Sequence, residues 1–133
     1  MFDYSYDYWQ TQANNIQFKN QSFINGEYRA AQSGETYDVI SPASEELLAQ
    51  VSACDEADVD AAVVSARAAF DSGVWAGRSP AERKAVVLKL AQLILENKEE
   101  LALLETLDMG KPVMDALNVE SQAPTEQNIQ EQK

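Results

Sequence analysis

The sequence predicts an α+β chain in which short antiparallel strands come first and three helices follow. An Asn25-Gly26 pair between short aromatic segments is typical of a two-residue hairpin turn. Apolar residues then recur every three or four positions through residues 55–109, which is the period of amphipathic helices. With 133 residues, 45% hydrophobic and 24% charged, the chain can build one modest core.

The β-rich part begins with the segment 23–29. Asn25 and Gly26 tolerate the positive φ angles of a type I′ turn, so the chain can reverse its direction within two residues. A Ser-Pro pair separates two further predicted strands, 36–40 and 47–51. We therefore expect a short antiparallel β-meander.

Each predicted helix has a start signal. Asp55 is a suitable N-cap for the first helix, which should end near Gly73. A capping box at 79–82 opens the second, and the third runs over about 99–109 before Gly110-Lys111-Pro112. The apolar stripe of the first helix comprises Val59, Ala62, Val63, Ala66 and Phe70. The other two helices are apolar around most of their circumference, so they need more partner surface than this chain supplies.

The two ends differ from the middle. Residues 1–22 form an aromatic and polar arm, with a short helix around 6–15, that we expect to lay its rings on a neighbouring surface. Residues 120–133 are rich in Gln and Glu and are expected to be disordered. The predicted organisation is thus an arm (1–22), a folded part (23–119) and a tail (120–133).

Composition argues against several classes of function. A formal charge of −12 repels phosphate backbones, and the sequence has no basic block, so we expect neither nucleic-acid nor membrane binding. No apolar run reaches the length of a membrane span. One cysteine and no histidine argue against a disulfide framework and a zinc site, and fit a cytoplasmic location.

Templates for catalysis match poorly. Cys54 has acidic residues close by in the sequence, whereas a cysteine nucleophile needs neighbours that favour the thiolate. Gly110-Lys111-Pro112 lacks the upstream glycine and the Ser or Thr of a phosphate loop, and therefore indicates a helix end. From the residues alone, the chain is a soluble α+β polypeptide without an assigned chemistry.

Several segments, in this order and spacing, resemble the opening of the aldehyde dehydrogenase superfamily. The segments are Phe23–Tyr28, Val39–Glu46, Asp58–Val63, Ala66–Phe70, Trp75, Ser79–Arg83 and Leu104–Pro112. Tyr8-Trp9 near the start and the run Ala102–Asp108 resemble, in particular, the group of γ-glutamyl-γ-aminobutyraldehyde dehydrogenases. The resemblance covers about Tyr8 to Val119, and the sequence departs from the family pattern beyond Val119.

The resemblance implies a place in the α/β fold of enzymes that oxidise aldehydes to carboxylates with NAD or NADP. In that family a cysteine attacks the aldehyde, hydride leaves to the nicotinamide, and a glutamate activates the hydrolytic water. The resemblance implies that these residues and the cofactor loops lie beyond Val119, and that Cys54 is not the catalytic cysteine. No catalytic or cofactor-binding residue is therefore expected here, and this chain alone is expected to bind neither NAD nor NADP.

Two positions match a cation site found in parts of the family. The resemblance implies that the main-chain carbonyl of Ile40 and the carboxylate of Asp108 hold a monovalent cation, with a third ligand from outside this sequence. The alternative for Asp108 is capping or an ion pair near a helix end.

Three hypotheses of function remain at this point. The first is a truncated aldehyde dehydrogenase that is inactive alone and meets its aldehyde substrate only as part of the full-length enzyme. The second is a small partner-binding protein that associates with full-length dehydrogenase subunits. The third is a standalone fold with a new role.

Overall fold

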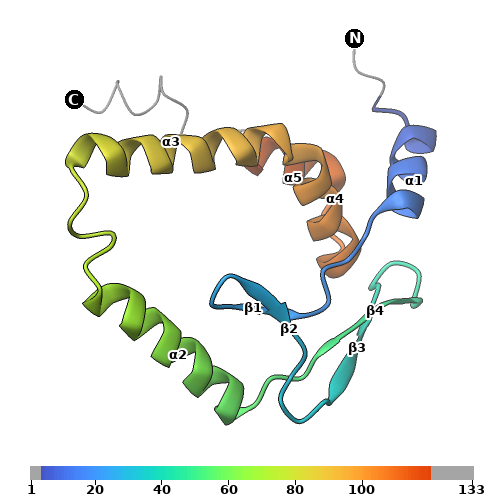
Figure 1. The fold of residues 1–133 in the computed structure, drawn as a ribbon. Helices are drawn as coiled ribbons and strands as arrows, with labels where there is room; N and C mark the ends of the chain where they lie inside the picture. The colour runs from blue at the N-terminus through green and yellow to red at the C-terminus, as the bar shows by residue number, and fades with distance from the viewer. Residues whose placement is uncertain (1–3, 121–133) are drawn as a thin grey trace. The chain divides into compact units, whose positions relative to one another are not determined.

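A computed structural model describes residues 4–120, which form five helices and four strands (Figure 1). In chain order they are α1 (Tyr6–Asn15), β1 (Ser22–Ile24), β2 (Glu27–Arg29), β3 (Thr36–Ile40), β4 (Leu47–Ser52), α2 (Glu56–Asp71), α3 (Pro80–Glu96), α4 (Lys98–Met109) and α5 (Val113–Glu120). The described residues divide into a helical unit (4–17, 41–46 and 84–120) and a hairpin unit (18–40 and 47–83). The predicted tail falls largely outside the described residues.

Most predicted elements are present, including the short helix of the arm. In the described part of the chain, however, the strands form two separate two-stranded sheets, β1–β2 and β3–β4, instead of one continuous meander. A turn closed by the Gly34 N–H donating to the Ala31 carbonyl (2.9 Å) occupies the segment between β2 and β3. This turn takes the backbone out of the extended conformation that a third paired strand would need.

The hairpin β1–β2 reverses at the predicted pair. Asn25 and Gly26 have φ angles of 55° and 81°, as a type I′ turn requires, and Ile24 pairs with Glu27. Across the two strands, the rings of Phe23 and Tyr28 lie edge to face with centroids 5.0 Å apart.

The second hairpin is longer and irregular near its turn. β3 and β4 pair from Thr36–Ser52 to Ile40–Leu47, with a bulge between Val39 and Ile40. Within the turn, the Ser41 N–H donates to the Glu46 carbonyl (2.9 Å). The buried Ser41 hydroxyl accepts from the N–H groups of Ala43 and Ser44 (3.3 Å each), so a side chain satisfies backbone groups that no strand pairs.

A buried carboxylate starts α2. Asp55 caps the helix by accepting from the N–H groups of Ala57 and Asp58, and Asp58 accepts in return from the Asp55 N–H (3.2 Å). Asp58 is only 4% exposed, and its two oxygens also accept from the backbone N–H of Gln32 (3.0 and 3.3 Å). One side chain thus joins the start of α2 to the loop that follows β2.

The capping box that opens α3 is formed as predicted. Glu82 Oε2 accepts from the Ser79 N–H (2.8 Å) and hydroxyl (2.7 Å), and the Glu82 N–H donates to Ser79 Oγ (3.3 Å). These hydrogen bonds from Ser79 hold the pKa of Glu82 below its usual value, because they stabilise the carboxylate form.

The fifth helix, α5 (Val113–Glu120), was not predicted. Gly110 ends α4 in the left-handed region (φ 78°), where a Cβ would lie 3.2 Å from Pro42 Cγ. Beyond it, the Pro112 carbonyl accepts from the N–H groups of Asp115 and Ala116 (2.9 and 3.0 Å). Proline interrupts a helix interior but suits a helix start, where its missing N–H is not needed, so Pro112 separates two helices.

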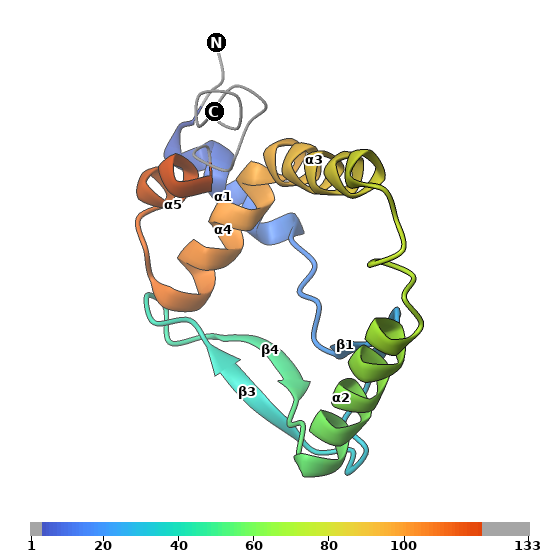
Figure 2. The same ribbon diagram turned by 90° about the vertical axis from the view of Figure 1, so that its left-hand side faces the viewer.

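The buried core of the helical unit lies where α5 packs on α4 (Figure 2). Ala102 and Ala116 are fully buried, and Leu103, Leu117 and Trp9 are each less than a tenth exposed. The small alanines let the two helices approach closely, while the larger side chains fill the surrounding space.

We predict that Asp58→Ala lowers the free energy of unfolding by about 1–3 kcal/mol, because it leaves the helix start and the Gln32 N–H without their acceptor. Urea denaturation followed by circular dichroism measures this change. Asp60→Ala is the matched control, since Asp60 is an exposed acid of the same helix; its effect should stay within about 0.5 kcal/mol. Equal effects of the two substitutions would contradict this role of Asp58.

Candidate functional site

Ile40, the first of the two residues predicted to hold a cation, is the last residue of β3. It follows the bulge in the ladder and precedes the 41–46 turn, and its side chain is 48% exposed. Its aliphatic side chain offers no ligand atom, so only the main-chain carbonyl is a candidate ligand.

Asp108, the second residue, lies one position before the end of α4, and its side chain is exposed. Within the described residues, its carboxylate has neither a hydrogen-bond nor an ion-pair partner. The nearby cation, Lys111, pairs instead with Glu105 (3.0 Å). A carboxylate at a helix C-terminus meets the negative end of the helix dipole, so a bound cation would stabilise it there. Ile40 and Asp108 belong to different units.

Cys54, the single thiol, is exposed and immediately precedes the N-cap of α2. Among the described residues, no histidine, cysteine or acid cluster has the size needed to hold a metal ion. In the same part of the chain, no helix is both long and apolar enough to cross a membrane.

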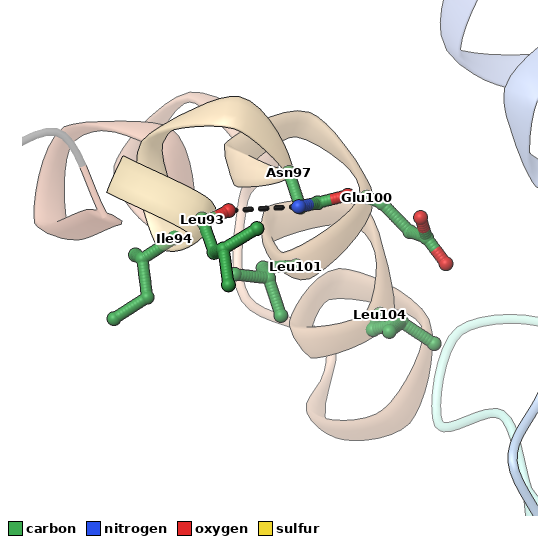
Figure 3. A pocket seen from close by; sticks show the side chains of 6 residues that line it. All are labelled: Leu93, Ile94, Asn97, Glu100, Leu101 and Leu104. Atoms are coloured by element: carbon green, nitrogen blue, oxygen red, sulfur yellow. Dashed lines mark hydrogen bonds between the residues drawn. The ribbon is translucent and has the colours of Figure 1, made fainter. Parts of the chain in front are cut away.

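An apolar groove lies at the junction of α3 and α4 (Figure 3). It has a volume of about 310 Å³ and is lined by Leu93, Ile94, Asn97, Glu100, Leu101 and Leu104. The Asn97 side-chain amide donates to the Leu93 carbonyl (2.7 Å), while the Glu100 carboxylate extends away from the leucines. The groove therefore presents aliphatic surface to solvent, with one carboxylate at its rim. Sequence reasoning recognised the excess of apolar residues on these helices but not this groove.

The predicted apolar stripe of α2 is also uncovered. Val59, Val63 and Phe70 are 56%, 60% and 74% exposed. In the described part of the chain, the guanidinium of Arg67 lies 5.4 Å from the Phe70 ring centroid and 3.7 Å from the Asp71 carboxylate. A helical stripe with this periodicity normally faces a core, so its exposure indicates surface suited to a further partner.

The aromatic arm packs against α4, as predicted for its rings. The hydroxyls of Tyr4 and Tyr8 both donate to the Glu99 carboxylate, at 3.1 and 2.6 Å. Tyr4 stacks on Trp9 with ring centroids 5.6 Å apart and planes at 13°, and Tyr8 meets Trp9 edge to face at 5.2 Å. Sequence reasoning missed Glu99, because its tyrosine partners lie 95 and 91 residues away in the sequence.

The Glu99 carboxylate disfavours ionisation of both phenols. For Tyr8, the hydrogen bond to Glu99 is the main cause of a raised pKa, followed by burial and the negative charge of Glu99. For Tyr4, burial is the main cause of the raised pKa and the hydrogen bond to Glu99 comes second. Both phenols therefore stay protonated and act as donors throughout the neutral range.

Comparison of this chain with known proteins identifies its family. Residues 28–127 match the model of the aldehyde dehydrogenase family. The chain is 46% identical over 110 residues to the NADP/NAD-dependent aldehyde dehydrogenase PuuC of Escherichia coli. This alignment covers 83% of the chain and 22% of that relative.

Solved structures agree with this match. The γ-glutamyl-γ-aminobutyraldehyde dehydrogenase of Burkholderia cenocepacia is 50% identical with a TM-score of 0.83, covering 85% of the chain and 23% of the relative. The indole-3-acetaldehyde dehydrogenase of P. syringae, solved with NAD+, is 56% identical with a TM-score of 0.81, covering 84% and 22%.

The chain spans about a fifth of the length of the curated relatives that it matches. Its antiparallel strand pairs and helices correspond to part of the aldehyde dehydrogenase fold, which confirms the predicted fold class and the resemblance. The match extends over residues 28–127 of the 133, well over half of the chain. The chain therefore belongs to the aldehyde dehydrogenase family.

Proposed function

We propose that this chain contributes the N-terminal part of an NAD(P)-dependent aldehyde dehydrogenase, and that the 133 residues alone do not oxidise aldehydes. The observation that carries the proposal is a family match over most of the chain that covers only 22% of the E. coli relative and 22% of the P. syringae enzyme. The part of the fold that binds cofactor and substrate then corresponds to the portion of the relatives that this chain does not match.

The chemistry of aldehyde oxidation supports the second half of the proposal. The reaction needs a thiolate nucleophile, a base for the hydrolytic water, and a site for the nicotinamide that accepts the hydride. The chain has one thiol and no histidine. That thiol, Cys54, is exposed and directly precedes the N-cap of α2, and the chain has no histidine to serve as its base.

We expect the purified 133-residue chain to form no NADH or NADPH when mixed with NAD+ or NADP+ and a panel of aliphatic, aromatic and amino aldehydes. The absorbance of the reduced nicotinamide measures the reaction, with the E. coli relative as the positive control. Cys54→Ser is the matched variant. Aldehyde-dependent production of NAD(P)H that disappears in Cys54→Ser would overturn the proposal.

The cation site is part of the same proposal. The Ile40 carbonyl and the Asp108 carboxylate supply two oxygen ligands, which suit a hard monovalent cation, and a third ligand comes from elsewhere in the complete enzyme. The support from this chain is the position of Asp108 at a helix C-terminus without a cationic partner among the described residues.

We expect Asp108→Asn to raise the free energy of unfolding by about 0.3–1 kcal/mol in tetramethylammonium chloride, because it removes a negative charge from the helix C-terminus. In potassium chloride at equal ionic strength the gain should shrink, since a bound cation already offsets that charge in the parent chain. Asp60→Asn should show no such salt dependence. An Asp108→Asn effect that is identical in both salts would refute cation binding at Asp108.

A second candidate function is association with dehydrogenase subunits. It is favoured by the apolar groove, where Leu93 and Leu101 remain 42% and 36% exposed. Burial of such aliphatic surface against a partner contributes roughly 25 cal/mol per Å². In this second candidate function, the groove is the contact surface, and the chain binds a full-length subunit without taking part in catalysis.

If the groove binds a subunit, sedimentation of the chain mixed with a full-length relative should show a complex that Leu93→Asp disrupts. Val64→Asp is the control, because Val64 is an equally apolar and more exposed residue of α2 in the other unit (68%). A mixture that sediments as two separate species argues against this candidate, and so does a complex that Leu93→Asp leaves intact.

A further inference from the structure

The aromatic arm has a self-contained backbone. Residues 6–15 form α1, which is capped by Ser5 accepting from the Tyr8 N–H. Thr11 and Asn15 hydrogen-bond to carbonyls one turn earlier in the same helix. The backbone N–H and C=O groups of α1 are thus hydrogen-bonded largely within the helix. Its contacts with α4 are made by side chains.

The surface that receives the arm is formed by one short stretch of sequence. We call it the arm seat: Glu99, Ala102 and Leu103 of α4 with Ala116 and Leu117 of α5. Glu99 accepts both tyrosine hydroxyls, and Trp9 packs on the four apolar residues until it is only 8% exposed. Since α4 packs on α5 directly, the arm seat does not depend on the arm for its own two helices.

The arm and the arm seat are far apart in the sequence, and the chain that connects them begins in an extended conformation. Tyr8 and Glu99 are 91 residues apart. Ile16 leaves α1 in an extended conformation (φ −67°, ψ 140°), and residues 16–21 contain neither helix nor strand. The chain passes from the helical unit to the hairpin unit between Gln17 and Phe18. A self-contained helix on an extended connector, with a remote seat, is the arrangement in which identical elements can be exchanged between protomers.

The seating of the arm is also incomplete. Among the described residues, no acceptor lies within hydrogen-bonding distance of the buried Trp9 Nε1. A buried donor without an acceptor disfavours the closed arrangement relative to one in which the arm is released into water. Release of the arm therefore recovers hydration for Trp9 while it exposes the arm seat.

We propose that two copies of this chain associate by exchanging arms, so that Tyr4, Tyr8 and Trp9 of one copy occupy the arm seat of the other. Exchanged and closed arms make the same contacts, so the balance depends on concentration. A tethered arm competes at an effective concentration on the order of millimolar. Two chains of formal charge −12 also repel each other. Exchange should therefore increase with protein concentration and with ionic strength.

The test uses two full-length variants, each made in a Trp75→Phe background so that Trp9 is the only fluorophore of its kind. The arm variant, Trp9→Ala, has a weakened arm and an intact seat. The seat variant, Glu99→Lys, has an intact arm and lacks the acceptor for both hydroxyls. We expect each variant alone to stay largely monomeric at concentrations where the equimolar mixture forms dimers, with an association constant for the mixture roughly tenfold above that of either variant, because one free arm then meets one free seat.

Sedimentation equilibrium measures the association, and a blue shift of Trp9 fluorescence on mixing shows that the arm of the seat variant becomes buried. Tyr6→Phe in the seat variant is the matched control, since Tyr6 lies in the same helix but is 79% exposed; it should change nothing. If Glu99→Lys alone leaves Trp9 buried, Leu103→Asp is added to empty the seat, with circular dichroism to verify the helices.

Two results would overturn the proposal. One is a mixture that stays monomeric although the fluorescence of the seat variant shows an exposed Trp9. The other is association that persists when the seat variant also carries Trp9→Ala, because exposed apolar helices, not the arm, would then hold the copies together. Neither outcome bears on aldehyde oxidation, so this test is independent of the proposed function.

Discussion

The close packing of α4 on α5 is the interaction on which the helical unit depends. Ala102 and Ala116 are fully buried because their small side chains let the two helix backbones approach each other. Gly110 and Pro112 make that packing reachable, since one ends α4 in a left-handed turn and the other begins α5 within three residues. The aromatic arm then adds the only large ring system among the buried residues that the structure describes, through Trp9.

The same packing leaves much apolar surface uncovered. Apart from Trp9, the buried hydrophobic residues in the described part of the chain are alanines and two leucines, whereas valines, leucines and an aromatic residue on α2, α3 and α4 remain more than a third exposed. A chain of 133 residues that exposes this much aliphatic surface gains little from folding around it. This imbalance agrees with the family match, because the chain covers only 22% of the E. coli relative.

The sequence predicted local structure well because the signals for that structure are local. Asn25-Gly26 is sufficient for a reversal, and Ser79 with Glu82 is sufficient for a helix start, whatever surrounds them. Sequence reasoning was less successful beyond Gly110, because it interpreted Pro112 only as part of a helix end, whereas Pro112 directly precedes α5. It also missed the pairing of Asp58 with Gln32 and that of Glu99 with Tyr8, because these partners lie 26 and 91 residues apart and no periodicity indicates such pairings.

The candidate sites also differ in how they were identified and in which residues build them. Ile40 and Asp108 were selected by a resemblance and have no local signal of their own, and the proposed cation site takes one ligand group from each. The groove and the arm seat, by contrast, are built entirely within the helical unit from residues of α3, α4 and α5. The proposed contact surfaces thus depend on helix packing within this chain, whereas a reaction centre requires several polar groups to converge. The described residues form the groove and the arm seat, and the proposed function assigns the reaction to the part of the relatives that this chain does not match.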